Sequence, residues 1–112
     1  MTSKTIAHNI DLWEAWIDVQ VTEEERTTTI FVVGDVVVNN LILEPRFVKC
    51  TPPPGLEKRL VLEIVPNILS EEGPEVEILY AEELDNVYQY SGVSICFDGE
   101  VIVEMDDLDI IY

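Results

Sequence analysis

The stretch Val93-Ser-Ile-Cys-Phe-Asp-Gly-Glu-Val-Ile-Val-Glu104 carries the clearest structural signal in this chain of 112 residues. Two runs rich in β-branched residues flank Asp98-Gly99, a strong signal for a β-hairpin because glycine accepts a positive φ without a steric clash. A two-residue loop at this pair would mix apolar and acidic side chains on one face. A three-residue loop, Phe97–Gly99, would instead gather four aliphatic side chains there: Val93, Ile95, Val101 and Val103. We therefore expect the three-residue loop.

Comparable strand patterns recur along the chain at intervals of roughly eight to twelve residues, with no internal repeat. A turn at Gly34-Asp35 is expected to join two strands that are apolar on both faces, which places that hairpin centrally in a sheet. The expected strands are Trp13–Val21, Thr27–Val33, Val36–Leu43, Arg46–Cys50, Lys58–Val65 and Glu75–Ala81, followed by the Val93 hairpin, whose second strand continues to Tyr112. This pattern predicts an all-β, mostly antiparallel fold: a single domain over residues 1–112, built as a sandwich or small barrel of about seven to nine strands.

Two segments allow a second interpretation. Apolar residues between Ile6 and Ile17 also fit a helical stripe, so residues 6–17 could form a helix in place of part of the first strand. The segment Ala81–Asn86 fits one short helical turn, and Val87–Gly92 then leads into the hairpin.

Charge is the most unusual property of the chain, with a formal net charge of −17. All six basic residues lie in the first 59 positions, whereas the segment from Leu60 to Tyr112 contains fourteen acids and no base. Nucleic acids and anionic membranes are disfavoured as partners because they are themselves polyanions. A basic protein partner is favoured. Met1–Thr5 lacks the apolar run of a signal peptide, so we expect a cytoplasmic location.

Groups suited to catalysis are scarce. His8 is the only histidine, and it has no serine or cysteine at a recognisable motif spacing. Cys50 and Cys96, with one histidine, cannot by themselves complete a four-ligand zinc site. We expect both thiols to be reduced and buried, and a disulfide between them is the alternative. The five glycines are scattered singly, so no phosphate-binding loop is present. We expect no enzyme activity, no metal and no cofactor.

The densest acidic stretch lies close to the C-terminus. Its apolar residues recur with a period of two and it contains no glycine, which favours a strand with outward acids over a calcium loop. The acids form either a plain solvated face or a docking patch for a basic partner, and Trp16 could add an aromatic contact if it points outward. The candidate partner-binding residues are Glu104, Asp106, Asp107, Asp109 and Trp16.

The function best supported by these features is an acidic protein-interaction module, of the inhibitor, immunity-type or regulatory kind, that docks on a basic partner through its acidic C-terminal half. One alternative is a small-ligand-binding β-barrel, which requires a cavity among the apolar residues. Another is a carboxylate-based hydrolase, which requires two close acids in a cleft. Open sheet edges also suggest a homodimer.

Overall fold

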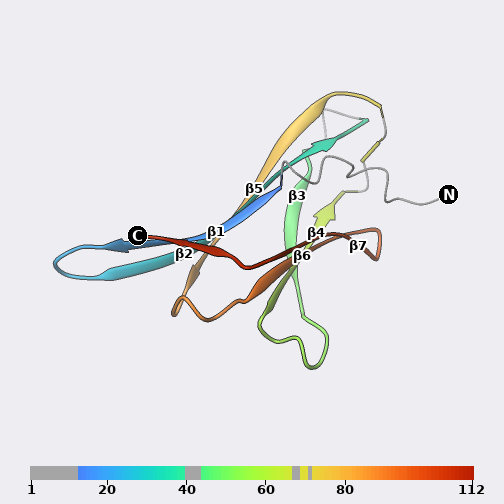
Figure 1. Cartoon of the computed structure of the whole chain (residues 1–112). Helices are drawn as coiled ribbons and strands as arrows, with labels where there is room; N and C mark the ends of the chain where they lie inside the picture. Colours follow the sequence, from blue (N-terminus) through green and yellow to red (C-terminus); the bar gives the residue numbers. More distant parts are fainter. Residues whose placement is uncertain (1–12, 40–43, 67–68, 71) are drawn as a thin grey trace.

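The computed structural model describes residues 13–39, 44–66, 69–70 and 72–112, and these residues form eight strands and no helix. The strands build two four-stranded sheets in the orders β5-β2-β1-β8 and β3-β4-β6-β7, here called the first and second sheets (Figure 1). Their bounds are β1 Glu14–Val21, β2 Arg26–Val37, β3 Arg46–Cys50, β4 Arg59–Val65, β5 Glu75–Leu84, β6 Gly92–Phe97, β7 Glu100–Asp106 and β8 Asp109–Ile111. The expected all-β class is confirmed, and the architecture is a sandwich and not a closed barrel.

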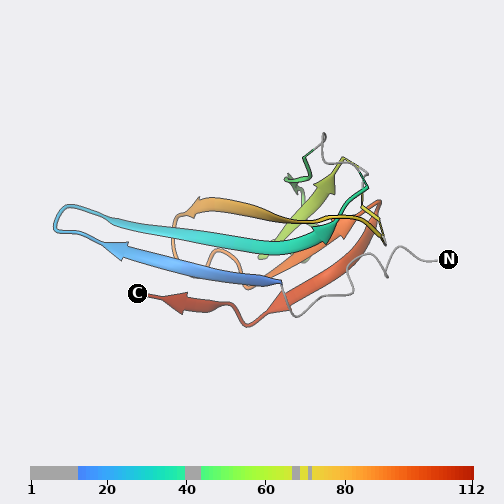
Figure 2. The same cartoon turned by 90° about the horizontal axis from the view of Figure 1, so that it is seen from above.

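Each sheet is mixed, because it contains one parallel pair, β1 with β8 and β4 with β6. Figure 2 shows β5, β2, β1 and β8 side by side, with the β1–β2 hairpin reaching beyond the second sheet. No helix long and apolar enough to cross a membrane occurs in the described part of the chain.

The core lies between the two sheets and follows from strand periodicity. Alternate residues of a strand point to opposite faces, so β-branched and leucine side chains at every second position meet in the middle. Ile17 and Val19 of β1 and Ile30 and Val32 of β2 are buried in this way. The second sheet contributes the buried side chains of Leu60, Leu62, Ile64, Val93, Ile95 and Val103.

The β6–β7 hairpin forms where the sequence predicts it, but the three-residue loop is wrong. The loop is Asp98-Gly99, with φ angles of 52° and 81°, and Phe97 pairs with Glu100. A register shift follows, so that Ile95 pairs with Val103 and Ile102 is the extra residue of a β-bulge. The bulge, and not a longer loop, places the aliphatic side chains of Ile95 and Val103 opposite each other. Val101, expected in the core, is therefore 48% exposed.

The expected turn at Gly34-Asp35 is also wrong. β2 runs without interruption from Arg26 to Val37 and pairs with β1 on one side and β5 on the other. Glycine is needed at position 34 because the Trp13 ring lies over it and leaves no room for a Cβ. The central position of this segment in a sheet is confirmed, and residues 40–43 of the expected second strand lie outside the described residues.

Two further expectations, both for the C-terminal half of the chain, are wrong. No helical turn begins at Ala81, because β5 continues to Leu84, whose buried side chain packs in the core. The strand after the hairpin does not reach Tyr112, since Asp107 adopts a positive φ of 55° and turns the chain toward the first sheet. The resulting β8 pairs with β1.

The remaining strand predictions agree with the structure to within a residue or two at their ends. β1, β3 and β4 occupy the predicted positions. The strand interpretation therefore holds over Glu14–Val21, while the part of the helical alternative before residue 13 lies outside the described residues. Cys50 and Cys96 are free thiols, as expected, but both are only partly buried.

Candidate functional site

The four acidic residues proposed for docking do not share one face. Glu104 and Asp106 pair with Ser94 and Gly92 of β6, and their side chains lie on the outer surface of the second sheet. Asp107 occupies the turn after β7, and Asp109 begins β8 at the edge of the first sheet. The chain crosses between the sheets at this turn, so Glu104 and Asp106 lie on the second sheet and Asp109 on the first, although Asp106 and Asp109 both line the cleft described below.

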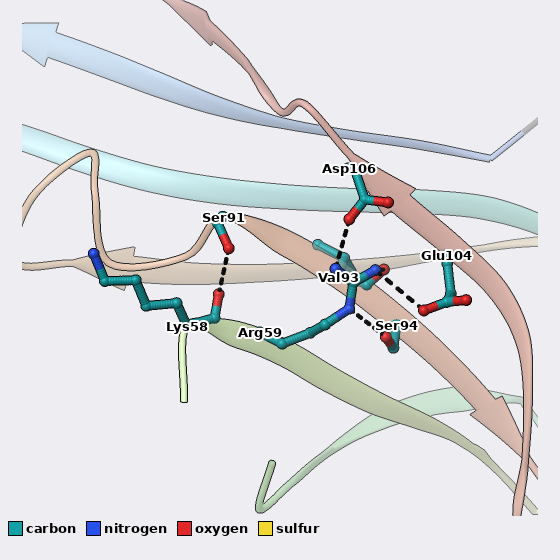
Figure 3. Close-up of polar contacts among 7 residues, drawn as sticks. All are labelled: Lys58, Arg59, Ser91, Val93, Ser94, Glu104 and Asp106. Atoms are coloured by element: carbon teal, nitrogen blue, oxygen red, sulfur yellow. Dashed lines mark hydrogen bonds and ion pairs between the residues drawn. The ribbon is translucent and has the colours of Figure 1, made fainter. Parts of the chain in front are cut away.

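Arg59 of β4 holds the first two of these acids (Figure 3). Its Nη1 donates to Asp106, and its Nη2 lies 3.5 Å from Glu104 Oε2. Its Nε also donates to Ser94 Oγ at 2.7 Å, and its Nη2 to the carbonyl oxygen of Val93 at 3.2 Å. The guanidinium thus contacts both β6 and β7, and Glu104 and Asp106 are parts of a structural ion cluster.

Gly92 makes room for this arrangement. It is the parallel partner of Arg59, and a Cβ at this position would collide with the guanidinium. The Arg59 side chain is only 16% exposed, although both of its carboxylate partners remain largely in solvent. The basic half of the chain thus neutralises part of the acidic half at this surface.

A different surface collects aromatic, aliphatic and acidic side chains: the outer face of the first sheet. Trp16 of β1 stacks on Phe31 of β2, with ring centroids 5.4 Å apart and planes inclined by 25°. The strand pairing places Ala81 beside Phe31, and Val33 beside Leu79, which is 59% exposed. Trp16 therefore belongs to an apolar cluster that spans three adjacent strands.

Carboxylates surround this apolar cluster. The pairing registers place Asp109 beside Trp16 at one side, and Asp35 beside Glu77 beyond Val33 and Leu79. We call the cluster and its border the acid-rimmed face. Its centre is Trp16, Phe31, Val33, Leu79 and Ala81, and its rim is Glu14, Asp18, Asp35, Glu77, Glu83 and Asp109. Among the outward positions of these four strands, as the structure describes them, none carries a basic residue.

A cleft of about 500 Å³ opens beside this face, at the beginning of β1. It lies where β1 extends past β8, because the first paired residues of these strands are Trp16 and Asp109. The Trp13 indole lines the cleft, and its Nε1 is buried with no hydrogen-bond partner among the described residues. The other lining residues are Glu14, Ala15, Met105, Asp106, Leu108 and Ile111, together with Trp16 and Asp109.

A partly buried ionisable cluster centres on Glu82 of β5 and ties the two sheets together. Its carboxylate accepts hydrogen bonds from Tyr80 at 2.6 Å, Tyr90 at 2.9 Å and Lys49 of β3 at 3.1 Å. Burial acts to raise the pKa of Glu82, but these hydrogen bonds outweigh it and hold the pKa below its usual value. Burial raises the pKa of Tyr80, and the hydrogen bond to the Glu82 carboxylate and its charge raise it further. Every partner is engaged within the cluster, which therefore serves the fold.

The two thiols lie on the outer face of the second sheet on either side of Glu63. Cys50 Sγ is 3.9 Å from Glu63 Oε1. Burial, and then the charge of Glu63, raises the pKa of Cys50, and burial with the neighbouring charges likewise raises that of Cys96. Both thiols are therefore weakly nucleophilic at neutral pH.

The described residues contain no group of three metal-ligating side chains placed to hold an ion. His8 lies outside the described part of the chain. Comparisons with protein-family models, with curated proteins and with solved structures found no significant match.

Of the residues on the acid-rimmed face, the sequence singled out Trp16 and Asp109 as candidates, but not Phe31, Leu79 or the rim acids of β2 and β5. A signal for Leu79 was present, because it shares the outward phase of β5 with Glu77 and Glu83. The neighbours of Trp16 could not be predicted from the sequence, because they come from strands that are distant along the chain.

Proposed function

We propose that this chain is an acidic interaction module that docks a basic protein partner on the acid-rimmed face. The observation that carries the proposal is the arrangement of that face: an apolar centre on three strands with carboxylates around it. Leu79 and Ala81 of this centre are exposed, and Trp16, Phe31 and Val33 are half-buried. Protein interfaces have this layout, with apolar and aromatic side chains at the centre and polar groups at the rim. The proposed docking surface is therefore the outer face of the first sheet, and not the acidic stretch near the C-terminus that the sequence suggested.

Charge complementarity identifies the class of partner. The net charge of −17 attracts a basic protein over long distances, and the rim places part of this charge where the partner would bind. A second copy of this chain is a poor occupant, because two acid-rimmed faces would bring like charges together. The partner is therefore a different protein, with basic side chains around an apolar patch.

The alternative functions have less support. The two sheets form a sandwich and not a closed barrel, and a small-ligand-binding function stays a prediction. A carboxylate-based hydrolase stays a prediction. The partly buried carboxylate of Glu82 accepts hydrogen bonds from Tyr80, Tyr90 and Lys49 and therefore serves the fold.

The test compares two variants of equal net charge. The face variant carries Asp18→Asn, Glu77→Gln and Glu83→Gln. The tip variant carries Glu23→Gln, Glu24→Gln and Glu25→Gln, in the loop between β1 and β2. Proteins captured from native lysate at low salt are eluted with a salt gradient, identified, purified, and measured for affinity.

We expect a basic protein that binds the wild type and the tip variant about equally and binds the face variant at least about tenfold more weakly. Equal affinity for the face and tip variants would show that the acid-rimmed face is not the docking surface. Failure to recover any basic protein would contradict the proposal as a whole.

A further inference from the structure

The cleft at the beginning of β1 has features of a socket for one side chain. Its volume of about 500 Å³ is within the range of pockets that enclose a ligand group, and it adjoins the acid-rimmed face through Trp16 and Asp109. The parallel pairing of β1 with β8 begins at Trp16 and Asp109, so the edge of β1 at Glu14 and Ala15 is not covered by β8.

The lining combines negative charge with apolar surface. Carboxylates come from Glu14, Asp106 and Asp109, and Asp106 uses its Oδ1 to accept the hydrogen bond from Arg59. The apolar part of the lining consists of Trp13, Ala15, Trp16, Met105, Leu108 and Ile111. A group that suits this lining is a cation with a long apolar stem.

Trp13 supplies an independent observation. Its side chain is only 6% exposed, and the buried Nε1 has no hydrogen-bond partner among the described residues. An unsatisfied buried N–H donor costs about 1–3 kcal/mol, so a buried donor of this kind calls for a physical explanation, such as strain or a bound water or ion. Trp13 is also one of the residues that line the cleft.

We propose that this cleft receives an arginine side chain of the basic partner, an inference that rests on the proposed function. Phe31 covers one face of the Trp16 ring, and on the β8 side the neighbour of Trp16 is Asp109. A guanidinium that enters on this side stacks on Trp16 while donating to Asp109.

Arginine fits this lining better than lysine. The guanidinium is planar, stacks on aromatic rings and donates to carboxylates in a fixed fork, whereas an ammonium is a strongly hydrated point charge. Its aliphatic stem would cover Met105 and Leu108.

The test uses three blocked peptides, Ac-Val-Arg-Val-NH2 and its lysine and citrulline counterparts, added to the full chain labelled with ¹⁵N. The two tryptophan indole N–H signals report on Trp13 and Trp16 separately. We expect saturable shifts of both signals with the arginine peptide, at a Kd of ~1–10 mM, and binding at least about fivefold weaker with citrulline. Equal shifts with all three peptides, or no saturable shift of the Trp16 signal, would overturn the assignment.

Variants at the cleft provide the second readout. Asp109→Asn should weaken the arginine peptide at least about threefold, Asp109→Glu should retain most of the affinity, and Asp98→Asn in the β6–β7 turn should leave it unchanged. Unchanged affinity in Asp109→Asn would remove the cleft from consideration.

Affinities of the variants for the captured partner distinguish a failure of this inference from a failure of the proposed function. Loss of partner affinity in the face variant with none in Asp109→Asn would overturn the socket and leave the docking face standing. Retention of partner affinity in both variants would overturn both.

Discussion

The indole ring of Trp13 lies directly over Gly34, in the space that a Cβ at that position would occupy. This contact explains why a glycine stands in the middle of the longest strand of the first sheet. The contact also fixes Trp13 directly before β1, where its ring packs edge-on against Phe47 with the ring centroids 6.0 Å apart. Trp13 is one of the residues that line the cleft.

Gly34→Ala should therefore destabilise the fold. The added methyl group overlaps a packed aromatic ring, and overpacking of this kind costs about 1–3 kcal/mol of unfolding free energy, measurable by urea denaturation. In a Trp13→Leu background the same substitution should cost less than half as much, because the smaller side chain can move away. An equal cost in both backgrounds would show that the ring is not the cause.

Arg59→Gln should destabilise the second sheet. It removes the charged hydrogen bonds to Ser94 and Asp106 and the ion pair with Glu104. We expect a loss of about 1–3 kcal/mol, at the lower end if solvent screens the exposed carboxylates. The matched control is Arg46→Gln on β3, an exposed position where the change should stay within about 0.5 kcal/mol. Similar losses for the two variants would contradict a special role for Arg59.

The Glu82 cluster should make stability depend on pH in the acid range. Because folding lowers the pKa of Glu82, its contribution is present above the ordinary value of 4.5 and is lost as the pH falls through the lower folded pKa. Glu82→Gln should cost about 1–2 kcal/mol at pH 7 and reduce the acid-dependent loss. The exposed neighbour Glu83→Gln is the control. A wild-type acid profile in Glu82→Gln would contradict this assignment.

Leu79→Thr should separate binding from stability. Leu79 is 59% exposed, so replacing it with another strand-forming residue should change the unfolding free energy by no more than about 0.5 kcal/mol. Its place at the centre of the acid-rimmed face predicts a fall in partner affinity of about fivefold or more. Val101→Thr, on the second sheet, makes a comparable change and should leave affinity unaltered. Parallel losses in the two variants would indicate a general surface effect.

Much of the fold could be predicted from local sequence, because alternation identifies strands wherever one face is buried. The positions of β1, β3, β4 and the β6–β7 hairpin follow from such alternation. The pair Gly34-Asp35 led to a wrong turn prediction because glycine followed by aspartate is a local turn signal. The glycine is present for another reason, which is its contact with the Trp13 ring. The bulge at Ile102 was hidden for a related reason, since two loop lengths fit the same apolar pattern.

The candidate site was less predictable, because it is assembled across strands. Sequence placed Trp16 and Asp109 far apart in the chain, and only the parallel pairing of β1 with β8 makes them neighbours. Charge counting also gave Glu104 and Asp106 a role in docking, although Arg59 engages both. A net charge reports the sign of a surface but not which acids already have a partner.

The most direct test of the docking account is the salt dependence of partner affinity in the two variants of equal charge. The wild type and the tip variant should lose affinity steeply as salt rises, and the face variant should bind weakly with a flatter dependence, because its rim acids are gone. Superimposable salt curves for the face and tip variants would show that only total charge matters, and that the acid-rimmed face does not bind the partner.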